Sequence, residues 1–546
     1  MSGIVGIVGD VYELEYRLAD MLRSLRHRGD CGSGFWVSSF VESRIGMAHC
    51  GRMVSETEED VRQPYVDEEE QVVVAVDGDI YNYAELREEL QAQYTFVTDS
   101  SVEVLSKAYR RWGEGCFARI NGVFAIALYD RRADVLLMAR DRYGVKPFYY
   151  TTCRGNLYFG SEIKSLFSAG LNRRISIERW AAYMLYGTYG PSYSTFWEGV
   201  SQLPAGALMR YNGYSLSENS WYDIKEEIER LVSLHDETAL RTMLEQELRT
   251  FVSRCMSDVS VCGFRIGRRA ELQILHNIAQ HGCQSGKMRT FADTTEDVVE
   301  QSDVLPIWVA PSHVVEELQR MKSWAEEPFD GCETIVRTRL FRHARRQGMK
   351  VVCSGVGLDV LWQDVWDNSG RNCNYLYPHK LFSPLVALYA AKPAYGSDFV
   401  NEEDRNRYCE LSQERLPHIL RVYDRSSAEA GVSVRLPFLG GHLVALSFAL
   451  PLVSRQNRKE FVAHYMPPNR KPIEPVEKEP LYPQWMSQSL KEWIAYNIEA
   501  LSMGEVRELF DVKQLRRMSN NFCNNKPLDM ALLWKCLSLQ CQLGDE

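Results

Sequence analysis

The chain has 546 residues, of which 45% are hydrophobic and 25% charged, and its formal net charge is −10. This length allows about three or four domains of ~150 residues, or two large ones, with more than one core and no disulfide staples. The composition excludes a disulfide miniprotein, a collagen-like chain and a disordered tail, and the acidic balance argues against a nucleic-acid binder, because it repels phosphate backbones.

The 14 cysteines contain no CxxC pair, which argues against a zinc ribbon or a redox dithiol and favours free thiols in a reducing cytosol. No apolar run reaches the ~18 residues of a membrane span. The first residues, MSGIVGIVGD, lack the basic segment and long apolar run of a signal peptide. We therefore predict a cytoplasmic protein without membrane or nucleic-acid partners.

The first part of the chain alternates short strand signals with helical periodicity. GIVGIV predicts one strand, QVVVAVDGDIYN a strand that reaches a turn at Asp77-Gly78, and GVFAIALYDRRADVLLMARD a hairpin. Apolar residues recur at helical spacing over 12–27, 83–94 and 102–112. Two sheets packed together between helices, an αββα sandwich, would accommodate this alternation.

The second part begins after a Gly- and Pro-rich connection, so we place a boundary near 205–225, with one domain over 1–205 and another over 225–546. Helical patterns at 232–255, 268–280 and 334–347 alternate with strand signals at 259–262, from 290 onward and at MKVVCSG. This alternation predicts a parallel sheet flanked by helices. The remaining residues are mostly helical in pattern.

Ser2 is the first candidate for chemistry. Removal of Met1 would expose the amine of Ser2, and a hydroxyl beside its own α-amine can act as nucleophile and base together. The spacing alone favours the simpler interpretation, a serine at the start of a strand.

Several longer strings occur in a fixed order: GIVGIVG, SLRHRG, QPY, DGDIYN, NGVFAIALYD, RDRYGVKPFYY and FGSEIKSL. Together they resemble the glutaminase domain of the asparagine synthetase family, the class II glutamine amidotransferases with an N-terminal nucleophile. The resemblance covers about residues 1–170 and continues more weakly through DRSSAEAGVSVRLPFL. It implies an Ntn-hydrolase-type sandwich followed by an ATP-pyrophosphatase-type synthetase domain that contains a parallel sheet and a helical C-terminal part.

The resemblance also assigns roles, and most of the matched positions carry another residue here. The family has a cysteine nucleophile where this chain has Ser2, an oxyanion-holding asparagine where it has Asp77, and an amine-binding acid where it has Ser101. Arg52 matches the arginine that binds the substrate carboxylate. The matched positions of this site are Ser2, Arg52, Asp77, Gly78, Asp79 and Ser101.

These changes bear on catalysis. An ionised Asp77 about 4 Å from a developing oxyanion would cost roughly 4 kcal/mol at an effective dielectric near 20. A lost oxyanion donor costs roughly 3–4 kcal/mol in other enzymes. Asp99, two residues before the matched acid position, could substitute for it. The nucleophile, the donor and the amine anchor thus differ from the family while the scaffold strings remain.

The family's ATP loop holds pyrophosphate on backbone N–H groups and magnesium on an aspartate. The corresponding loop here contains Gly267, Arg268, Arg269 and Ala270, so alanine replaces the magnesium ligand. Arg268 and Arg269 could still bind an anion, or they could be the solvated start of a helix.

A second family motif corresponds to Ser354, Gly355, Gly357 and Asp359, followed by Val360 in place of an acid. Losing one carboxylate weakens a site for a hard cation, so at most Asp359 remains as a metal ligand. A third motif, at 433–440, has lost both of its acids. We predict no metal site and no cofactor outright; ATP and magnesium are implied only if the synthetase site works.

Three functions remain open. The first is a catalytically silent or repurposed homologue that acts as a partner or regulator, for example of an active paralogue. The second is an ATP-dependent ligase that forms an amide or other C–N bond from ammonia or another amine. The third is glutamine-hydrolysing asparagine synthesis. The resemblance also implies a homodimer that pairs through the glutaminase domain.

Overall fold

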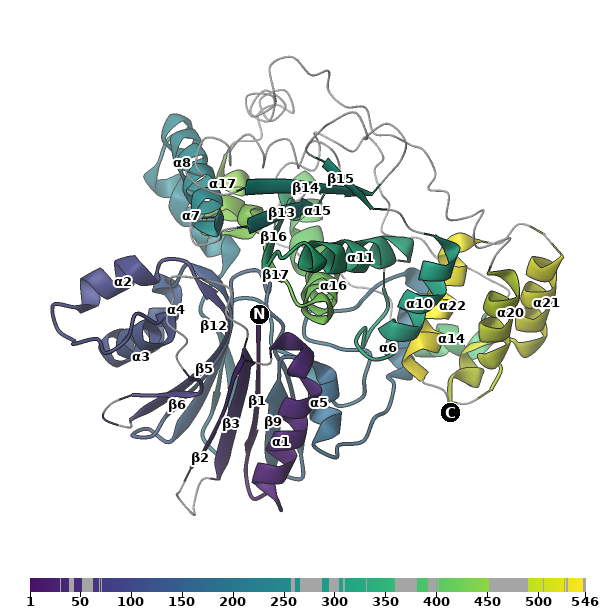
Figure 1. Ribbon diagram of the computed structural model, residues 1–546, viewed down its shortest axis with the longest axis horizontal. Helices are drawn as coiled ribbons and strands as arrows, with labels where there is room; N and C mark the ends of the chain where they lie inside the picture. Colours follow the sequence, from purple (N-terminus) through teal and green to yellow (C-terminus); the bar gives the residue numbers. More distant parts are fainter. Residues whose placement is uncertain are drawn as a thin grey trace.

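The computed structural model describes residues 1–29, 31–38, 44–51, 62–67, 69, 71–256, 261–265, 287–293, 304–307, 310–329, 331–358, 381–390, 399, 402–450, 490–503, 505–524, 526 and 529–543. Arg52, Gly267, Arg268, Arg269, Ala270 and Asp359 lie outside these residues. Figure 1 shows two sheets from the first part of the chain below a third sheet, with helices beside them.

The first two sheets are antiparallel and have six strands each. Sheet A contains, in spatial order, β10 (Ser201–Gln202), β8 (Tyr149–Cys153), β9 (Asn156–Gly160), β1 (Ser2–Val8), β3 (Ile45–Gly51) and β2 (Cys31–Val37). Sheet B contains β12 (Leu216–Ser220), β11 (Ala207–Tyr211), β7 (Val135–Arg140), β6 (Gly122–Asp130), β5 (Val72–Ile80) and β4 (Tyr65–Val66). The hairpin predicted from GVFAIALYDRRADVLLMARD is confirmed as β6 and β7.

Helices cover the outer face of each sheet, which gives the predicted αββα layers (Figure 1). Apolar side chains alternate along β1, so Ile4 packs between the sheets, whereas Val5 and Ile7 pack against the helices. Helices α1 (Leu14–Ser24) and α5 (Ile163–Ser168) cover sheet A; α2 (Tyr83–Leu90) and α3 (Ser101–Trp112) cover sheet B. The other helices of this part are η1 (Arg26–Arg28), η2 (Gly113–Gly115), α4 (Cys116–Arg119) and α6 (Ile177–Tyr186).

The turn predicted at Asp77-Gly78 is wrong, because β5 continues through both residues to Ile80. Gly78 has a φ of 143° in this strand, and a Cβ there would lie 2.0 Å from the carbonyl oxygen of Val123 on β6. Glycine is required at this position by the close approach of two strands and by its backbone conformation.

Replacing Gly78 by alanine is therefore expected to lower the free energy of unfolding by at least about 2 kcal/mol, because a backbone clash adds to an unfavourable φ. Gly115→Ala is the matched control, since a Cβ at Gly115 meets no atom within 4 Å and should change stability by less than about 0.5 kcal/mol. Chemical denaturation measures both variants. Equal free energies of unfolding for Gly78→Ala and Gly115→Ala would show that β5 and β6 leave room for a Cβ at residue 78.

The second part contains a five-stranded sheet in which every pair of neighbours is parallel. Its strands, in spatial order, are β15 (Val304–Ile307), β14 (Lys287–Asp293), β13 (Val261–Arg265), β16 (Val351–Ser354) and β17 (Ser433–Arg435). The carboxyl ends of β13 and β16 meet, since Arg265 pairs with Ser354. The strand predicted at 259–262 thus extends further, and the helix predicted at 268–280 lies outside the described residues.

Helices make up most of the remaining part that the structure describes. The single helix predicted at 232–255 is instead two, α7 (Ile224–Leu234) and α8 (Glu237–Met256), because Asp236 accepts a hydrogen bond from the backbone N–H of Ala239 and begins a new helix. The others are α10 (Pro311–Met321), α11 (Cys332–Arg346), α14 (Pro384–Tyr389), α15 (Glu402–Ser412), α16 (Arg415–Ala430), η4 (Pro437–Leu439), α17 (Leu443–Ala449), α20 (Lys491–Ala500), η5 (Glu505–Leu509), α21 (Val512–Cys523) and α22 (Met530–Leu543).

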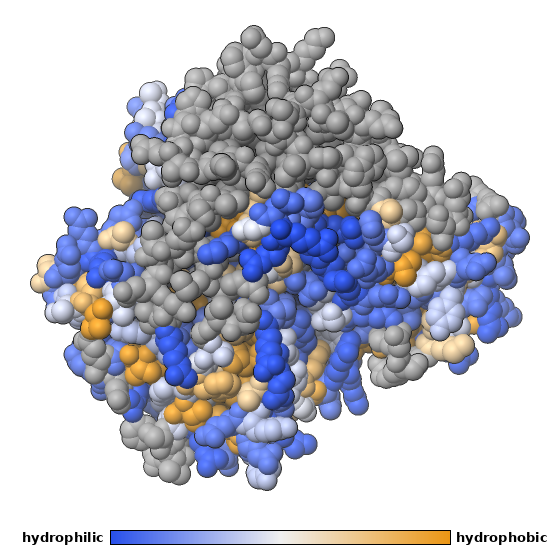
Figure 2. All heavy atoms as spheres, in the orientation of Figure 1, coloured by the Kyte–Doolittle hydropathy of each residue, from blue (hydrophilic) through white to orange (hydrophobic). Residues whose placement is uncertain are grey.

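The two parts share apolar cores. Val123 and Tyr143 from the first part belong to the same buried cluster as Leu248 and Phe438 from the second. On the face shown in Figure 2, hydrophilic side chains gather over α11, whose last turn carries exposed arginines. No helix within the described ranges is both long and apolar enough to cross a bilayer.

Candidate functional site

The structure brings Ser2 and Asp77 together, as the resemblance implied. Ser2 begins β1 in sheet A, and Asp77 lies in β5 of the facing sheet. The Ser2 hydroxyl donates a hydrogen bond of 3.1 Å to Oδ1 of Asp77. The two side chains lie where the inter-sheet core meets the second part of the chain.

Asp77 is fully buried, and its carboxylate is saturated with polar neighbours. Its four neighbours are the Ser2 hydroxyl at 3.1 Å and Lys146 Nζ at 3.4 Å on Oδ1, and Arg28 Nη2 at 3.0 Å and the Ser161 hydroxyl at 2.9 Å on Oδ2. A carboxylate offers about four lone-pair positions. An asparagine amide in this place would direct its N–H₂ group at cations or hydroxyl donors, so the acceptor-only chemistry of aspartate suits the site.

Asp77 is one corner of a closed group of four charges, which we call the charge square: Arg28, Asp77, Lys146 and Asp424. Arg28 donates to Asp424 through Nη1 at 2.7 Å and Nη2 at 3.0 Å. Lys146 Nζ lies 3.3 Å from Asp424 as well as 3.4 Å from Asp77. Each cation therefore contacts both carboxylates, and Asp424 on α16 joins the second part of the chain to the Ser2 site.

Local structure explains how the two cations reach this point. The Asp141 carboxylate accepts backbone N–H groups of Tyr143, Val145 and Lys146 at 2.9–3.2 Å, which folds the loop after β7 and directs Lys146 inward. Arg28 ends η1, and its Nε donates to the Ser2 carbonyl oxygen at 2.6 Å.

The square holds its groups in their charged forms. Burial by itself raises the pKa of Asp77, but Lys146 and Arg28 lower it to about 2. Burial by itself lowers the pKa values of Arg28 and Lys146, yet the surrounding carboxylates raise both. Asp77 is consequently ionised at neutral pH, so it is a weak base toward the Ser2 hydroxyl and has no proton to donate to an oxyanion.

Two further titratable side chains lie beside the square. Glu162 accepts from Arg28 at 2.7 Å and contacts His27 and Lys164 at 2.8 Å each; burial raises its pKa, but His27 and Lys164 lower it to well below the usual value. Burial lowers the pKa of His49 to about 4 despite the nearby Asp77, so its buried imidazole is neutral at pH 7.

A second buried ionic cluster joins the two parts next to the square. Glu327 accepts from Arg421 at 2.8 Å and from Arg425 at 2.5 Å, and Arg425 also donates to the Tyr149 hydroxyl of sheet A at 2.5 Å. The neighbouring Glu326 accepts the backbone N–H of Ile163 at 2.9 Å. Helix α16 supplies Arg421, Asp424 and Arg425, so one helix provides polar contacts to both ionic clusters.

Of the other predicted residues of the first site, Asp79 lies near the site, since its charge acts on Lys146. Asp79 lies 3.8 Å from Arg435 of β17. Ser101 is the first residue of α3, capped by Ser100. Asp99, the candidate substitute for the amine-binding acid, is largely exposed and pairs with Arg87 at 3.0 Å.

Three residues matched to the second motif of the family's synthetase domain lie within the described structure: Ser354, Gly355 and Gly357. They form a turn after β16. Ser354 ends the strand, and its hydroxyl donates to the Tyr423 hydroxyl at 3.4 Å. Gly357 has a φ of 100°, and a Cβ there would lie 2.6 Å from Leu439, whereas Gly355 accepts the N–H of Leu358. Tyr423 precedes Asp424 on α16, so adjacent residues contact the turn and the charge square. In the described part, no group of three or more His, Cys, Asp or Glu side chains is arranged to hold a metal.

The sequence strings contained the other members of the charge square and Glu162 beside it, but sequence reasoning assigned them no role. Arg28 lies in SLRHRG, Lys146 in RDRYGVKPFYY, Glu162 in FGSEIKSL and Asp424 in DRSSAEAG. Each is a charged residue beside hydrophobic segments, which is the available signal for a buried ion pair, because isolated charges are rarely buried.

Comparison with known proteins yields related sequences. Residues 1–222 match a family described as a glutamine amidotransferase domain. The asparagine synthetase (glutamine-hydrolyzing) 1 of Bacillus subtilis (strain 168) is 34% identical over 213 residues, which are 38% of this chain and 33% of that protein. A putative asparagine synthetase (glutamine-hydrolyzing) 2 of Methanocaldococcus jannaschii is 24% identical over 461 residues, which are 74% of this chain and 86% of that protein.

The chain spans about a third of the length of the first of these relatives. Among solved structures, the glutamine phosphoribosylpyrophosphate amidotransferase of B. subtilis is 14% identical with a TM-score of 0.31, and the match covers 65% of this chain and 81% of that one.

Proposed function

The chain belongs to the asparagine synthetase family, with a class II glutamine amidotransferase domain at its N-terminus, and from this membership we propose that it is a member that does not hydrolyse glutamine at Ser2. Its amidotransferase-type half serves instead as a structural part of a partner or regulatory protein. The observation that carries this proposal is the saturation of Asp77 by Ser2, Ser161 and the two cations of the charge square.

The state of the nucleophile supports the proposal. The Ser2 hydroxyl donates a hydrogen bond to a carboxylate whose pKa is about 2. A base that weak does not activate the Ser2 hydroxyl, because general-base catalysis works best at a pKa near the working pH, so activation would have to come from the α-amine that removal of Met1 exposes.

The oxyanion position supports it as well. Removing one oxyanion donor costs other enzymes roughly 10²–10³ in kcat, and here the matched position carries a negative charge. Arg28 cannot serve as a replacement donor without giving up a present acceptor, because its five N–H groups already donate to the Ser2 carbonyl oxygen, Glu162, Asp77 and Asp424.

Glutamate release from glutamine tests the proposal. The purified chain is expected to release no glutamate above a no-protein blank, and Ser2→Ala should leave this background unchanged. A Ser2-dependent release would overturn the proposal. Gly115→Ala, which faces open space in the first part of the chain, controls for contaminating glutaminase carried through purification.

A second candidate is an ATP-dependent ligase that forms a C–N bond from ammonia or another amine. It is favoured by the turn at Ser354 and Gly355, which lies at the carboxyl ends of parallel strands, where open α/β sheets bind their ligands. Pyrophosphate release from ATP, measured with amine donors present, distinguishes the candidates, because a partner or regulator should release none.

We also propose that the chain divides into two domains, at 1–205 and 225–546. Sheet B continues through β12 to Ser220, and α7 begins at Ile224. A junction just after Ser220 would therefore keep sheet B intact.

A further inference from the structure

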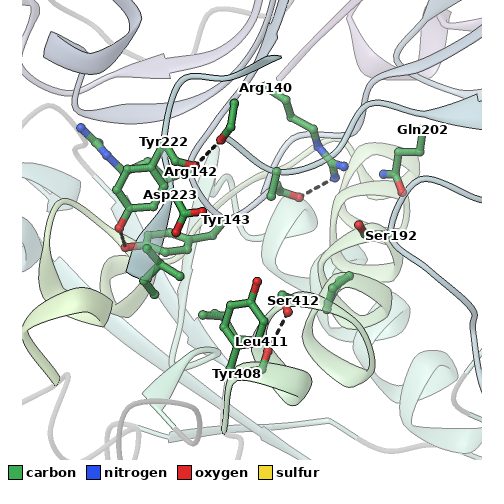
Figure 3. A pocket seen from close by; sticks show the side chains of 15 residues that line it. Arg140, Arg142, Tyr143, Ser192, Gln202, Tyr222, Asp223, Tyr408, Leu411 and Ser412 are labelled. Atoms are coloured by element: carbon green, nitrogen blue, oxygen red, sulfur yellow. Dashed lines mark hydrogen bonds between the residues drawn. The ribbon is translucent and has the colours of Figure 1, made fainter. Parts of the chain in front are cut away.

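A pocket of about 190 Å³ opens where the first part of the chain meets α15 and α16. In Figure 3, Asp223 and Tyr222 lie on one side of it and Arg140, Gln202 and Ser192 on the other, while Tyr408 projects from α15 between them. The pocket is separate from the Ser2 site and from the turn after β16, and neither of those sites shares a lining residue with it.

One wall carries a buried positive charge. Arg140 is only 3% exposed, and its guanidinium donates to the carbonyl oxygens of Lys146, Leu203 and Gly144 at 2.6–2.7 Å. Carbonyl oxygens orient a guanidinium but bring no formal charge to it. Burial lowers the pKa of Arg140 to about 10, although the neighbouring Asp141 raises it, and an anion in the pocket would add a charge contact to this guanidinium.

The opposite wall carries a negative charge. Asp223 is the N-cap of α7, and its Oδ1 accepts the backbone N–H groups of Lys225 at 2.7 Å and Glu226 at 3.4 Å. This role uses one carboxylate oxygen and leaves Oδ2 able to accept from a ligand. Arg142, the other cation of the lining, packs against the rings of Trp221 and Tyr222 and points away from the pocket (Figure 3).

The rest of the lining suits a small, partly apolar molecule. The Tyr408 ring and Leu411 supply apolar surface, and the Ser192 hydroxyl supplies a neutral polar group. At about 10–15 Å³ for each water-sized group, the volume holds roughly 13 to 19 non-hydrogen atoms.

We propose that this pocket binds a small zwitterion of the amino-acid type, with its carboxylate toward Arg140 and its ammonium toward Asp223. Because the walls come from both parts of the chain, the ligand would hold them together. The proposal does not depend on the function assigned to the Ser2 site.

The test is calorimetric titration and thermal unfolding of the full chain with each protein amino acid in turn. At least one should bind saturably and raise the melting temperature. Its N-acetyl derivative and its carboxamide, which lack one charge each, should bind at least about tenfold more weakly, because a hydrogen bond to a charged group is worth about 1.5–3 kcal/mol.

Asp223→Asn is the decisive variant, because asparagine keeps the helix cap and removes the charge. It should weaken binding by about tenfold or more while leaving the melting temperature of the free protein unchanged. Ser2→Ala should bind like the unmodified chain, which separates this pocket from the Ser2 site. No binding by any amino acid, equal binding by the neutralised derivatives, or unchanged binding by Asp223→Asn would each overturn the proposal.

Discussion

Asp77→Asn is expected to lower the free energy of unfolding by about 3–5 kcal/mol, although asparagine is the residue that the family resemblance places at this position. The amide removes a negative charge that Arg28 and Lys146 share. Its N–H₂ group would also face donors, because every neighbour of the Asp77 carboxylate in the described structure is a cation or a hydroxyl. Chemical denaturation at pH 7 measures the loss.

Removing a cation together with Asp77 supplies the control. Lys146→Met alone leaves Asp77 and Asp424 with Arg28 as their shared cation, whereas Asp77→Asn combined with Lys146→Met removes one charge of each sign. The double variant should be more stable than the sum of the single losses predicts, by at least about 1 kcal/mol of coupling. If the losses in free energy of unfolding of the two single variants simply add up in the double variant, Asp77 and Lys146 are not coupled. That result would contradict the charge square as the reason why residue 77 is an aspartate.

The pH dependence of stability reports on the same carboxylate. The pKa of Asp77 is about 2 in the folded chain, below its ordinary value of 3.8. Its stabilisation is therefore complete above the unfolded value and is lost as the pH falls through about 2, which amounts to about 2 kcal/mol. Asp77→Asn should show a correspondingly shallower loss between about pH 5 and pH 2. Identical slopes would show that Asp77 is not stabilised by its neighbours.

Arg28→Met is expected to have the largest effect, a loss of about 5 kcal/mol or more, because three buried carboxylates lose a shared cation. Arg28 contacts Asp77, Glu162 and Asp424 within 3.0 Å and is itself fully buried. Denaturation at pH 7 is the measurement, with soluble yield as the readout if the variant does not fold.

Arg23→Met is the matched control for Arg28. Arg23 lies on α1 close to Arg28 in sequence, but it is exposed and pairs with Asp20 three residues before it, so its loss should cost less than about 1 kcal/mol. Arg28→Lys should be intermediate, because an ammonium cannot reproduce the fork that binds Asp424 through two nitrogens. Similar stabilities for the methionine variants at both positions would contradict the buried cluster.

Local sequence patterns predicted the helices and strands well. They did not predict which distant residues contact one another. The β6–β7 hairpin and the helices near 12–27, 83–94 and 102–112 follow from apolar spacing, which acts over a few residues. The turn expected at Asp77-Gly78 failed because glycine serves a close approach of strands as readily as a turn.

The Ser2 site shows the same difference between local patterns and long-range contacts. Ser2 and Asp77 could be brought together through family strings, but the contact between Arg28 and Asp424 joins residues 396 positions apart. No local pattern encodes that pairing, and one sequence carries no record of joint variation. The chemical role of Asp77 depends on its neighbours. From the residue type alone we predicted that Asp77 would repel an oxyanion, but we did not predict that two cations, Arg28 and Lys146, lie beside it.

The most direct test of the central claim uses an electrophilic glutamine analogue that alkylates amidotransferase nucleophiles, followed by the intact mass of the chain. The account predicts an unchanged mass, because the Ser2 hydroxyl donates its hydrogen bond to an ionised carboxylate of pKa about 2, which is too weak a base to take the proton. A single adduct that maps to Ser2 and disappears in Ser2→Ala would contradict it.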